Sequence, residues 1–388
     1  MPTLAQIRAL LSLAAACCAL VAIAGGALAA DPPVPIPIDP PGVPPVNPPL
    51  PPGPGGGPGG GTSQAEAGCN RFASPRGSDR ARGTIGRPFR TVRRLNQALR
   101  PGMQGCLRRG VYRDDVKISR GGRRGSPVVI RPYQGERARI IGRFWVARSA
   151  DDVRIEGLYL DGRNAQRLPS PTVNAARASF VGNDVTNHHS AICFGLGTVQ
   201  YGRATSTVIR GNRVHDCGRL PRTNHDHGIY VEQASGTVIE DNWIYGNADR
   251  GVQLYPNAQN TIIRRNVIHG NATGIVFSGA FGEASSGALV EQNVLTGSAE
   301  RYNVESYWPD PARVGHDNVV RSNCLMAGVR GRRSGGLQLP AIGFEVGPNI
   351  IERLRYAAPR RGDFRIRGGG ACAAMLGSPQ PLPGPRAR

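Results

Sequence analysis

A short pattern of apolar and polar positions recurs six times between residues 180 and 325. In each copy an apolar residue is followed three positions later by Asn, and a second apolar residue stands two positions after that Asn. The strand-forming residues in and around it alternate with period two, which predicts short β-strands. The copies are residues 180–185, 209–214, 239–244, 263–268, 290–295 and 320–325, and residues 155–160 fit as an earlier copy without Asn.

Repeat units of this length cannot bury an apolar face alone, but a stack of them makes a continuous core. We therefore expect stacked coils whose two apolar columns point inward. From the second copy onward, the position two before the Asn alternates between Arg and Glu, and parallel strands lie about 4.8 Å apart, which predicts an ion-pair ladder on the outer surface. We expect the Asn column to be structural, because Asn tolerates a left-handed turn and stacked amides can bond along the axis.

The repeat resembles the right-handed parallel β-helix of the pectate-lyase-like superfamily over about residues 150–330. Segments 72–75, 88–91 and 110–112 are similar to the N-terminal cap of secreted members. The resemblance implies an all-β, right-handed parallel β-helix solenoid with a short N-terminal capping helix. In that helix Val92, Leu95, Ala98 and Leu99 would cover the open core. Residues 362–366 resemble the closing segment. Because this superfamily includes lyases, epimerases, hydrolases and non-enzymes, fold does not settle function.

Composition divides the rest of the chain. Residues 1–29 hold one charge, Arg8, and an apolar run ending in Ala27-Leu28-Ala29, which predicts a secretory signal peptide. Residues 30–68 contain 14 prolines and a glycine tract, which predicts a disordered tether. We assign residues 69–150 to the N-terminal cap and first coils, 151–330 to the β-helix repeats and 331–388 to the closing segment and tail. The expected location is extracellular, either secreted or tethered at the cell surface.

The 388-residue chain has a formal net charge of +21, and Lys117 is its only lysine. An exported protein this basic should attract polyanions, and acidic polysaccharide is the expected partner. Nucleic acid is not expected, because no aromatic residues interleave Arg-rich runs such as 120–124. Low aromatic content, 6%, argues against a large helical core and a multi-spanning membrane protein. We expect a monomer with no stable membrane insertion once the signal peptide is cleaved.

Six cysteines follow the predicted signal peptide, and an even number in an exported protein predicts disulfides. We expect the pairs Cys69–Cys106 and Cys324–Cys372, each fastening one end of the domain. The pairing of Cys193 with Cys217 stays open. The absence of a CxxC motif argues against a cysteine metal or redox site.

The candidate chemistry lies on a second strand that follows each Asn turn. Aligning Gly228 with Gly251 places four residues of one coil beside four of the next: Asp226 on Asp249, His227 on Arg250, Tyr230 on Gln253 and Glu232 on Tyr255. The apolar strand residues alternate inward, so we expect Tyr230, Glu232, Gln253 and Tyr255 to face outward, as Asn303 and Glu305 would on a later coil. This register gathers carboxylates, an imidazole, a guanidinium and two phenols within roughly 10 Å. Trp308, in a long insertion, would wall the groove.

This set of groups fits β-elimination at a uronate in an acidic polysaccharide. The reaction needs a group that offsets the sugar carboxylate, a base for the C5 proton and an acid for the leaving oxygen. We assign Arg250 or His225 to the carboxylate, and His227 to the base because a neighbouring Arg keeps it neutral. Tyr230 or Tyr255 would be the acid. The candidate substrate-binding residues are His225, Glu232, Gln253, Asn303, Glu305 and Trp308. C5 epimerisation needs nearly the same groups, so this sequence does not separate lyase from epimerase.

Two other functions stay open. In a glycoside hydrolase, Asp226 and Asp249, about 5 Å apart, would form a retaining pair. In a non-catalytic surface protein that binds glycans, the same residues would only cap turns. The two Asp residues are also the candidate ligands for Ca2+, the one cofactor considered. The sequence lacks the dense Asp cluster of calcium-dependent pectate lyases, and its single lysine argues against a lysine-based site.

Overall fold

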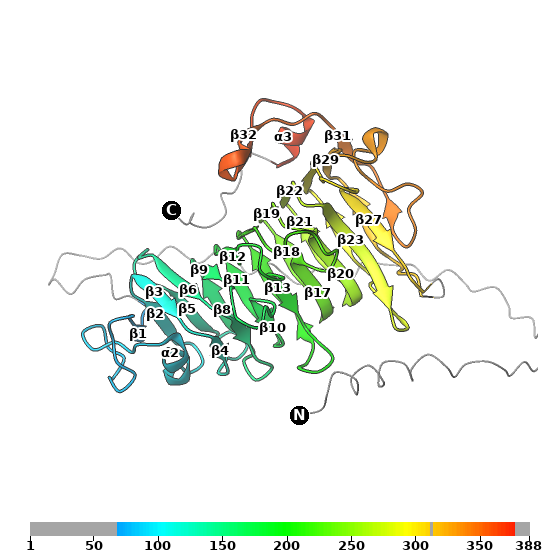
Figure 1. Cartoon of the computed structure of the whole chain (residues 1–388). Coiled ribbons are helices and arrows are strands. Elements are labelled where there is room, and N and C mark those ends of the chain that lie inside the picture. The colour runs from blue at the N-terminus through cyan, green and yellow to red at the C-terminus, as the bar shows by residue number, and fades with distance from the viewer. Residues whose placement is uncertain (1–67, 311–312, 377–388) are drawn as a thin grey trace, which may run out of the picture. The chain divides into compact units, whose positions relative to one another are not determined.

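In the computed structural model, which describes residues 68–310 and 313–376, short strands stack into three sheets (Figure 1). Each full coil gives one strand to each sheet, and pairing between successive coils is parallel. Sheet 1 contains β1 (Arg71–Ala73), β2 (Gln104–Leu107), β5 (Val128–Pro132), β8 (Val153–Glu156), β11 (Ser179–Val181), β15 (Val208–Arg210), β18 (Val238–Glu240), β21 (Ile262–Arg264), β25 (Leu289–Glu291), β28 (Val319–Arg321) and β30 (Glu345–Val346).

The strands that follow the Asn turns form sheet 2, and the strands that carry the candidate chemistry form sheet 3. Sheet 2 contains β3 (Gly110–Arg113), β6 (Ala138–Ile141), β9 (Tyr159–Asp161), β12 (Asp184–Thr186), β16 (Arg213–His215), β19 (Trp243–Tyr245), β22 (Val267–His269), β26 (Val294–Thr296), β29 (Cys324–Met326) and β31 (Ile350–Ile351). Sheet 3 contains β4 (Val116–Ile118), β7 (Phe144–Val146), β10 (Thr172–Val173), β13 (Phe194–Leu196), β14 (Ala204–Thr205), β17 (His227–Ser235), β20 (Arg250–Gln259), β23 (Thr273–Ala280), β24 (Glu283–Ala284) and β27 (Val304–Tyr307).

The two apolar columns of the repeat form the core, which confirms the predicted fold class. All twelve side chains of these columns are at most 1% exposed: Phe180, Ile209, Ile239, Ile263, Val290, Val320, Val185, Val214, Ile244, Ile268, Leu295 and Leu325. The inward positions of sheet 3, such as Ile229, Val252 and Ile275, join the same cluster. Each coil therefore buries its apolar face against its neighbours, as the repeat pattern requires.

The Asn residues form a hydrogen-bonded column between sheets 1 and 2, but they do not adopt the expected left-handed conformation. Asn242 Nδ2 donates to Asn266 Oδ1 at 2.9 Å, and Asn242 Oδ1 accepts from Asn212 Nδ2 at 3.0 Å. The positive φ angles belong to the preceding residues, for example 58° at Asp241 and 53° at Arg265. The turn thus places its strained residue in front of the Asn, which leaves the amide free to bond along the axis.

The Arg and Glu column differs from the expected surface ladder, because its central carboxylate is buried. Glu240 is 0% exposed and pairs with Arg210, Arg264 and Arg265. Burial alone would raise the pKa of Glu240, but hydrogen bonds from these arginines hold it below its ordinary value. Removing one partner of such a buried pair costs more than breaking an exposed pair.

The N-terminal end of the core is covered by helix α2 (Val92–Ala98), as predicted. Thr91 caps the helix by accepting a hydrogen bond from Arg94 N, and Val92, Leu95 and Leu99 are at most 1% exposed. Gly105 of β2 permits this close packing, since an added Cβ would lie 2.9 Å from both Leu95 Cδ2 and Leu99 Cδ1.

The C-terminal segment divides between two places: Leu337 and Phe344 close the end of the core, and residues 354–366 pack on the outer face of sheet 2. It contains 3-10 helices η2 (Arg332–Ser334) and η3 (Pro359–Arg361), the antiparallel strands β32 (Tyr356–Ala358) and β33 (Asp363–Ile366), and helix α3 (Ala371–Leu376). Phe364 of β33 is 1% exposed and contacts Trp243, Tyr245 and His269. At the end of the core itself, Phe344 stacks on Phe277.

Three disulfides fasten the solenoid: Cys69–Cys106, Cys193–Cys217 and Cys324–Cys372. The first and third join the cysteines paired in the sequence analysis, and the second answers the pairing left open there. Within the described ranges, no helix has the length and apolar character needed to cross a membrane. The predicted signal peptide and nearly all of the predicted tether lie outside the described residues.

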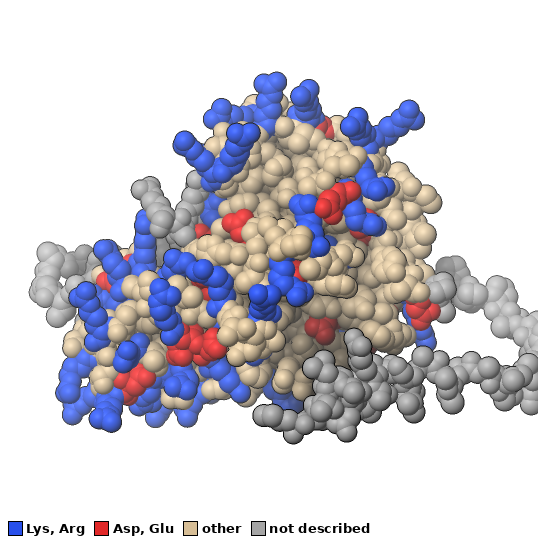
Figure 2. All heavy atoms as spheres, viewed as in Figure 1, with Lys and Arg blue, Asp and Glu red and all other residues tan. Residues whose placement is uncertain are grey.

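Positive side chains gather over the N-terminal cap and the C-terminal segment (Figure 2). Arg76, Arg80 and Arg87 surround one hollow in the cap. Three more arginines, Arg353, Arg355 and Arg367, surround another in the C-terminal segment. Acidic residues are sparser in this view, which fits the formal charge of +21.

Candidate functional site

An open pocket of about 530 Å³ lies on the outer face of sheet 3, across β17, β20, β23 and β27. These four strands are neighbours in the sheet (Figure 1). The strands supply His227, Tyr230, Arg250, Gln253, Tyr255, Ser278, Glu305 and Tyr307, and the adjoining loops supply Asn224, His225, Arg301 and Pro309. Seven of the twelve residues predicted for the site therefore line one pocket, six of them from the strands and His225 from the preceding loop.

The register predicted from the Gly228–Gly251 alignment is present between β17 and β20. His227 pairs with Arg250 and Tyr230 pairs with Gln253, before the register shifts between Val231 and Gln233. Inward residues alternate with these, so the strand pattern itself aims the polar side chains at the pocket. Tyr230 and Tyr255 stack with their ring centroids 6.3 Å apart.

Three buried polar atoms of the pocket residues have no hydrogen-bond partner in the protein: His227 Nδ1, Arg250 Nε and Gln253 Oε1. His227 and Gln253 are each 4% exposed. A buried polar atom without a partner costs about 1–3 kcal/mol, so native proteins leave few of them. Three in one pocket indicate a place where a polar ligand supplies the missing partners.

The electrostatics of the pocket keep its imidazole neutral and its phenols protonated. Burial, followed by the charges of Arg250 and His225, lowers the pKa of His227 well below its ordinary 6.5. Burial, with Glu232 and Tyr255 nearby, raises the pKa of Tyr230 above its ordinary 10.0. Near neutral pH the pocket therefore offers an unprotonated imidazole as a proton acceptor and a phenol as a proton donor.

The guanidinium of Arg250 is held in place from the loop that precedes β17. Its Nη1 donates to Asn224 O and its Nη2 to Asn224 Oδ1, both at 2.8 Å. Burial lowers the pKa of Arg250, but its guanidinium stays positively charged, because arginine does not lose its proton in proteins. A second guanidinium, that of Arg301, is bound by Glu305 through bonds of 2.7 and 2.9 Å. Of the two guanidinium groups, Arg250 has the buried nitrogen without a protein partner, its Nε.

Glu232 lies beside the pocket rather than in its lining. Burial raises the pKa of Glu232 to about 7, and its charge acts on both Tyr230 and Tyr255. A carboxyl group with this pKa can exchange a proton near neutral pH.

Asp226 and Asp249 do not line the pocket, contrary to their predicted catalytic role. Asp226 Oδ2 accepts from Arg219 Nε at 2.6 Å, and Asp249 Oδ2 accepts from Asp226 N at 2.9 Å. Thr223 Oγ1 bonds to both carboxylates, and each residue is 4% exposed. These bonds fasten the loop of residues 218–226 to the solenoid.

The same bonds occupy one oxygen of each carboxylate, Asp226 Oδ2 and Asp249 Oδ2, which a bound Ca2+ would otherwise use. Among the described residues, no group of three or more His, Cys, Asp or Glu side chains is placed to hold a metal ion. The structure thus gives a structural role to the pair proposed as hydrolytic acids or metal ligands.

Asn303 and Trp308 also lie elsewhere than predicted. Asn303 is 1% exposed, and its Nδ2 donates to the backbone oxygens of Leu295, Met326 and Gly335. It occupies the interior beside a second column of amides, in which Asn247 bonds to Asn271. Trp308 Nε1 donates to Ile342 O, and its ring packs against the core cluster instead of walling the groove.

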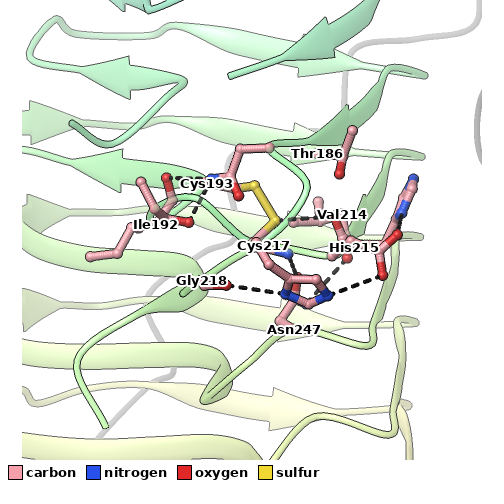
Figure 3. Close-up of a disulfide and its surroundings, with 12 residues drawn as sticks. Thr186, Ile192, Cys193, Val214, His215, Cys217, Gly218 and Asn247 are labelled. Atoms are coloured by element: carbon pink, nitrogen blue, oxygen red, sulfur yellow. Dashed lines mark hydrogen bonds and ion pairs between the residues drawn. A yellow bond between two sulfur atoms is a disulfide. The ribbon is translucent and has the colours of Figure 1, made fainter. Parts of the chain in front are cut away.

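The Cys193–Cys217 disulfide positions the loop that enters the pocket (Figure 3). Cys217 precedes the loop, and its N–H donates to Asn247 Oδ1 at 3.1 Å. Cys193 N donates to His227 O at 3.1 Å, at the other end of the loop. Both ends of the loop are therefore tied to Cys193, which directly precedes β13.

Three residues of the pocket were not singled out from the sequence: Asn224, Arg301 and Pro309. All three stand in loops, where no strand alternation marks which side chain turns toward the sheet. The four-residue spacing between Arg301 and Glu305 was the one available signal, because it fits an ion pair next to the predicted strand.

A match to a family model agrees with the fold. Residues 153–306 match the family described as right handed beta helix region. A 71-residue stretch is 32% identical to the uncharacterized protein YwoF of Bacillus subtilis (strain 168), and it covers 18% of this chain and 15% of that protein.

Solved structures with a similar fold include XylC in complex with xylose, at a TM-score of 0.50 and 12% identity over 74% of this chain and 71% of that one. Pectate lyase Pel9A follows at 0.48 and 13%, over 73% and 78%. Lacto-N-biosidase from Eubacterium ramulus matches at 0.47 and 12%, over 73% and 67%. The repeat, the three stacked sheets and the family match together show that this chain is a right-handed parallel β-helix protein.

Proposed function

We propose that this protein is an exported polysaccharide lyase or C5-epimerase that acts on uronate residues of an acidic polysaccharide. The observation that carries the proposal is the pocket on sheet 3, in which a buried, neutral His227 pairs in register with Arg250 and adjoins Tyr230. Proton abstraction next to a carboxylate needs these three kinds of group. The three disulfides fit a protein that folds in an oxidising compartment, as the predicted signal peptide requires.

Each step has a candidate residue. Arg250 offsets the charge of the sugar carboxylate, so that the C5 proton becomes more acidic. His227 accepts that proton, and the electron pair forms the C4–C5 double bond as the C4–O bond breaks. Tyr230 donates its proton to the departing oxygen, which leaves an unsaturated uronate at the new chain end.

Epimerisation shares the first step and ends differently. If the C4–O bond stays intact, a proton returns to C5 from the opposite face of the sugar and inverts the centre. Glu232, whose pKa burial raises to about 7, is a second group able to supply a proton. The two reactions can therefore be separated by their products and by isotope uptake.

The test is an incubation of the mature protein in D2O with pectate, alginate and glycosaminoglycans. Elimination gives the ultraviolet absorbance of an unsaturated uronate, whereas epimerisation places deuterium at C5 without that absorbance. We expect His227→Gln and Tyr230→Phe to lower the rate by about 10²–10⁴-fold, the usual contribution of a general acid or base.

Two matched variants control for nonspecific effects. His316→Gln changes an exposed histidine bonded to Asp317, and Tyr133→Phe changes a tyrosine of the N-terminal cap; both should keep the full rate. Thermal unfolding of His227→Gln should stay close to wild type, because His227 Nδ1 has no protein partner to lose. The proposal fails if no polymer gives absorbance or deuterium, or if both pocket variants keep the wild-type rate.

A further inference from the structure

A second pocket of about 220 Å³ opens on sheet 3 closer to the N-terminus, around Trp145 of β7. Its other lining residues come from β4, from the residues directly before β4 and β7, and from an exposed loop: Asp115, Val116, Lys117, Arg143, Gln166 and Leu168. Trp145 is partly exposed, and its Nε1 donates to Asn174 Oδ1 at 2.8 Å, which fixes the orientation of the ring.

This pocket faces the same side of the sheet as the first. An unbroken row of register partners runs from Lys117 to Trp145, Thr172, Gly195 and Tyr230. Between these positions the side chains point into the core, as Phe144, Val173 and Phe194 do. Trp145 and Tyr230 are three strand spacings apart, or about 14 Å along the solenoid.

The groups in the second pocket suit an acidic sugar. Lys117 Nζ lies 4.5 Å from the centre of the Trp145 ring, and Arg143 Cζ lies 5.1 Å from it. Arg143 Nε is buried without a partner, while the Arg143 N–H donates to Asp115 Oδ1. Tyr201 meets the indole edge to face at 5.6 Å. A fixed aromatic ring can cover the apolar face of a pyranose, and the two cations can bind its carboxylate.

A ridge separates the two pockets. Pro169 lies over Gly195, where an added Cβ would come within 3.0 Å of Pro169 Cβ. Thr172 Oγ1 donates to Pro169 O at 2.6 Å, so the loop of residues 162–170 also covers the neighbouring strand. A polysaccharide held at both pockets must pass over this ridge, and an oligosaccharide short enough to fit one pocket cannot contact both.

We propose that Trp145, Lys117 and Arg143 form a distal subsite that binds an acidic sugar of the same chain whose reacting residue occupies the His227 pocket. The inference rests on the proposed function, since it assumes a uronate polymer as ligand. It assigns affinity for long chains to the distal subsite and the chemistry to the first pocket. Variants of the distal residues should therefore raise KM for polymers and leave kcat nearly unchanged.

Because Lys117 is the only lysine, amine-reactive labelling reports on the subsite directly. We would label the mature His227→Gln protein at neutral pH with and without oligogalacturonates and oligomannuronates, from disaccharide to octasaccharide. Mass spectrometry separates the Lys117 adduct from that of the N-terminus. The octasaccharide should protect Lys117, and the disaccharide should not.

Binding by calorimetry completes the test. Lys117→Gln should weaken octasaccharide binding about three- to fivefold, and Trp145→Ala about tenfold, equal to about 1.4 kcal/mol. Neither should change disaccharide binding. Arg124→Gln, which removes the same charge from an exposed position of the cap, should leave octasaccharide binding unchanged. If Trp145→Ala does not fold, Lys117→Gln at its exposed position still decides the question.

The outcomes separate this inference from the proposed function. Protection and length dependence without turnover by the wild-type protein would keep the subsite and reject the lyase or epimerase. Turnover without length dependence would reject the subsite alone. The inference is overturned if octasaccharide binds while Lys117 stays fully reactive, if Arg124→Gln weakens binding as much as Lys117→Gln, or if no oligouronate binds.

Discussion

Among single residues, His227 organises the pocket, because burial and the charge of Arg250 lower the pKa of its imidazole and keep it neutral. Tyr230 contacts it edge to face, with ring centroids 5.4 Å apart. The lowered pKa of His227 suits a proton acceptor, and the raised pKa of Tyr230 keeps the proton that it would donate in the proposed reaction.

The pH profile follows from these shifts. Activity should be lost as pH falls through the lowered pKa of His227, so the acidic limb of kcat/KM lies well below pH 6.5. The basic limb should lie above pH 10.0, where Tyr230 loses its proton. We expect a flat profile between these limits, measured by initial rates on the active polymer. A limb near pH 7 would instead identify Glu232 as the group that must change its proton state.

The strand residues of the site could be predicted from the sequence better than its loop residues. Strand alternation and one Gly–Gly alignment were enough to pair His227 with Arg250 and Tyr230 with Gln253. The same alignment also put Asp226 beside Asp249, but it could not show that Arg219 and Thr223 turn back to bind these carboxylates. The conformation of a loop follows no sequence period, so the alignment could not predict these bonds.

Among the structural elements, the turn between sheets 1 and 2 is the best-determined feature. The Asn amides bond to one another and to backbone groups of neighbouring coils, and Asn183 through Asn323 are all 0% exposed. Apolar columns flank this turn on both sides, so the sequence pattern and the structure agree here most closely. The C-terminal segment was harder to place, because Phe364 packs on aromatic residues from three separate elements: Trp243 and Tyr245 of β19, His269 of β22 and Tyr356 of β32.

The amide column predicts a strong dependence of stability on its interior members. In Asn242→Ala, Asn212 N, Asn212 Nδ2 and Ile209 O each lose a buried partner. We expect a loss of about 3 kcal/mol in the free energy of unfolding, from the shift of the urea midpoint.

Asn349→Ala is the matched comparison, since Asn349 ends the column and is partly exposed. Water can replace part of its bonding, so the loss should be about 1 kcal/mol. Equal losses in the two variants would contradict a cooperative interior column.

For the whole molecule, net charge shapes the encounter with a polymer more than it shapes the fold. The arginines of the cap and the C-terminal segment lie apart from the pocket residues, so their effect reaches a ligand through the long-range field. Such a field is screened over about 10 Å at 0.1 M salt.

Affinity for an acidic polysaccharide should therefore fall steadily as salt rises, whereas a neutral polysaccharide should show no such trend. Surface-plasmon measurements on immobilised pectate across a salt series would check this, with the association rate falling more than the dissociation rate rises. A salt-independent association rate would show that the charge has no part in capture.

The amide column has a consequence for how such a protein can change over generations. Partners in the column are separated by 29, 30, 24, 27, 30 and 26 residues, yet every link has the same geometry, between 2.9 and 3.0 Å. Insertions and deletions are therefore absorbed elsewhere on each coil, in the loops that border sheet 3. Evolution can therefore change the loops around the pockets, and with them the ligand that is bound, while the amide column and the coils that it joins stay the same.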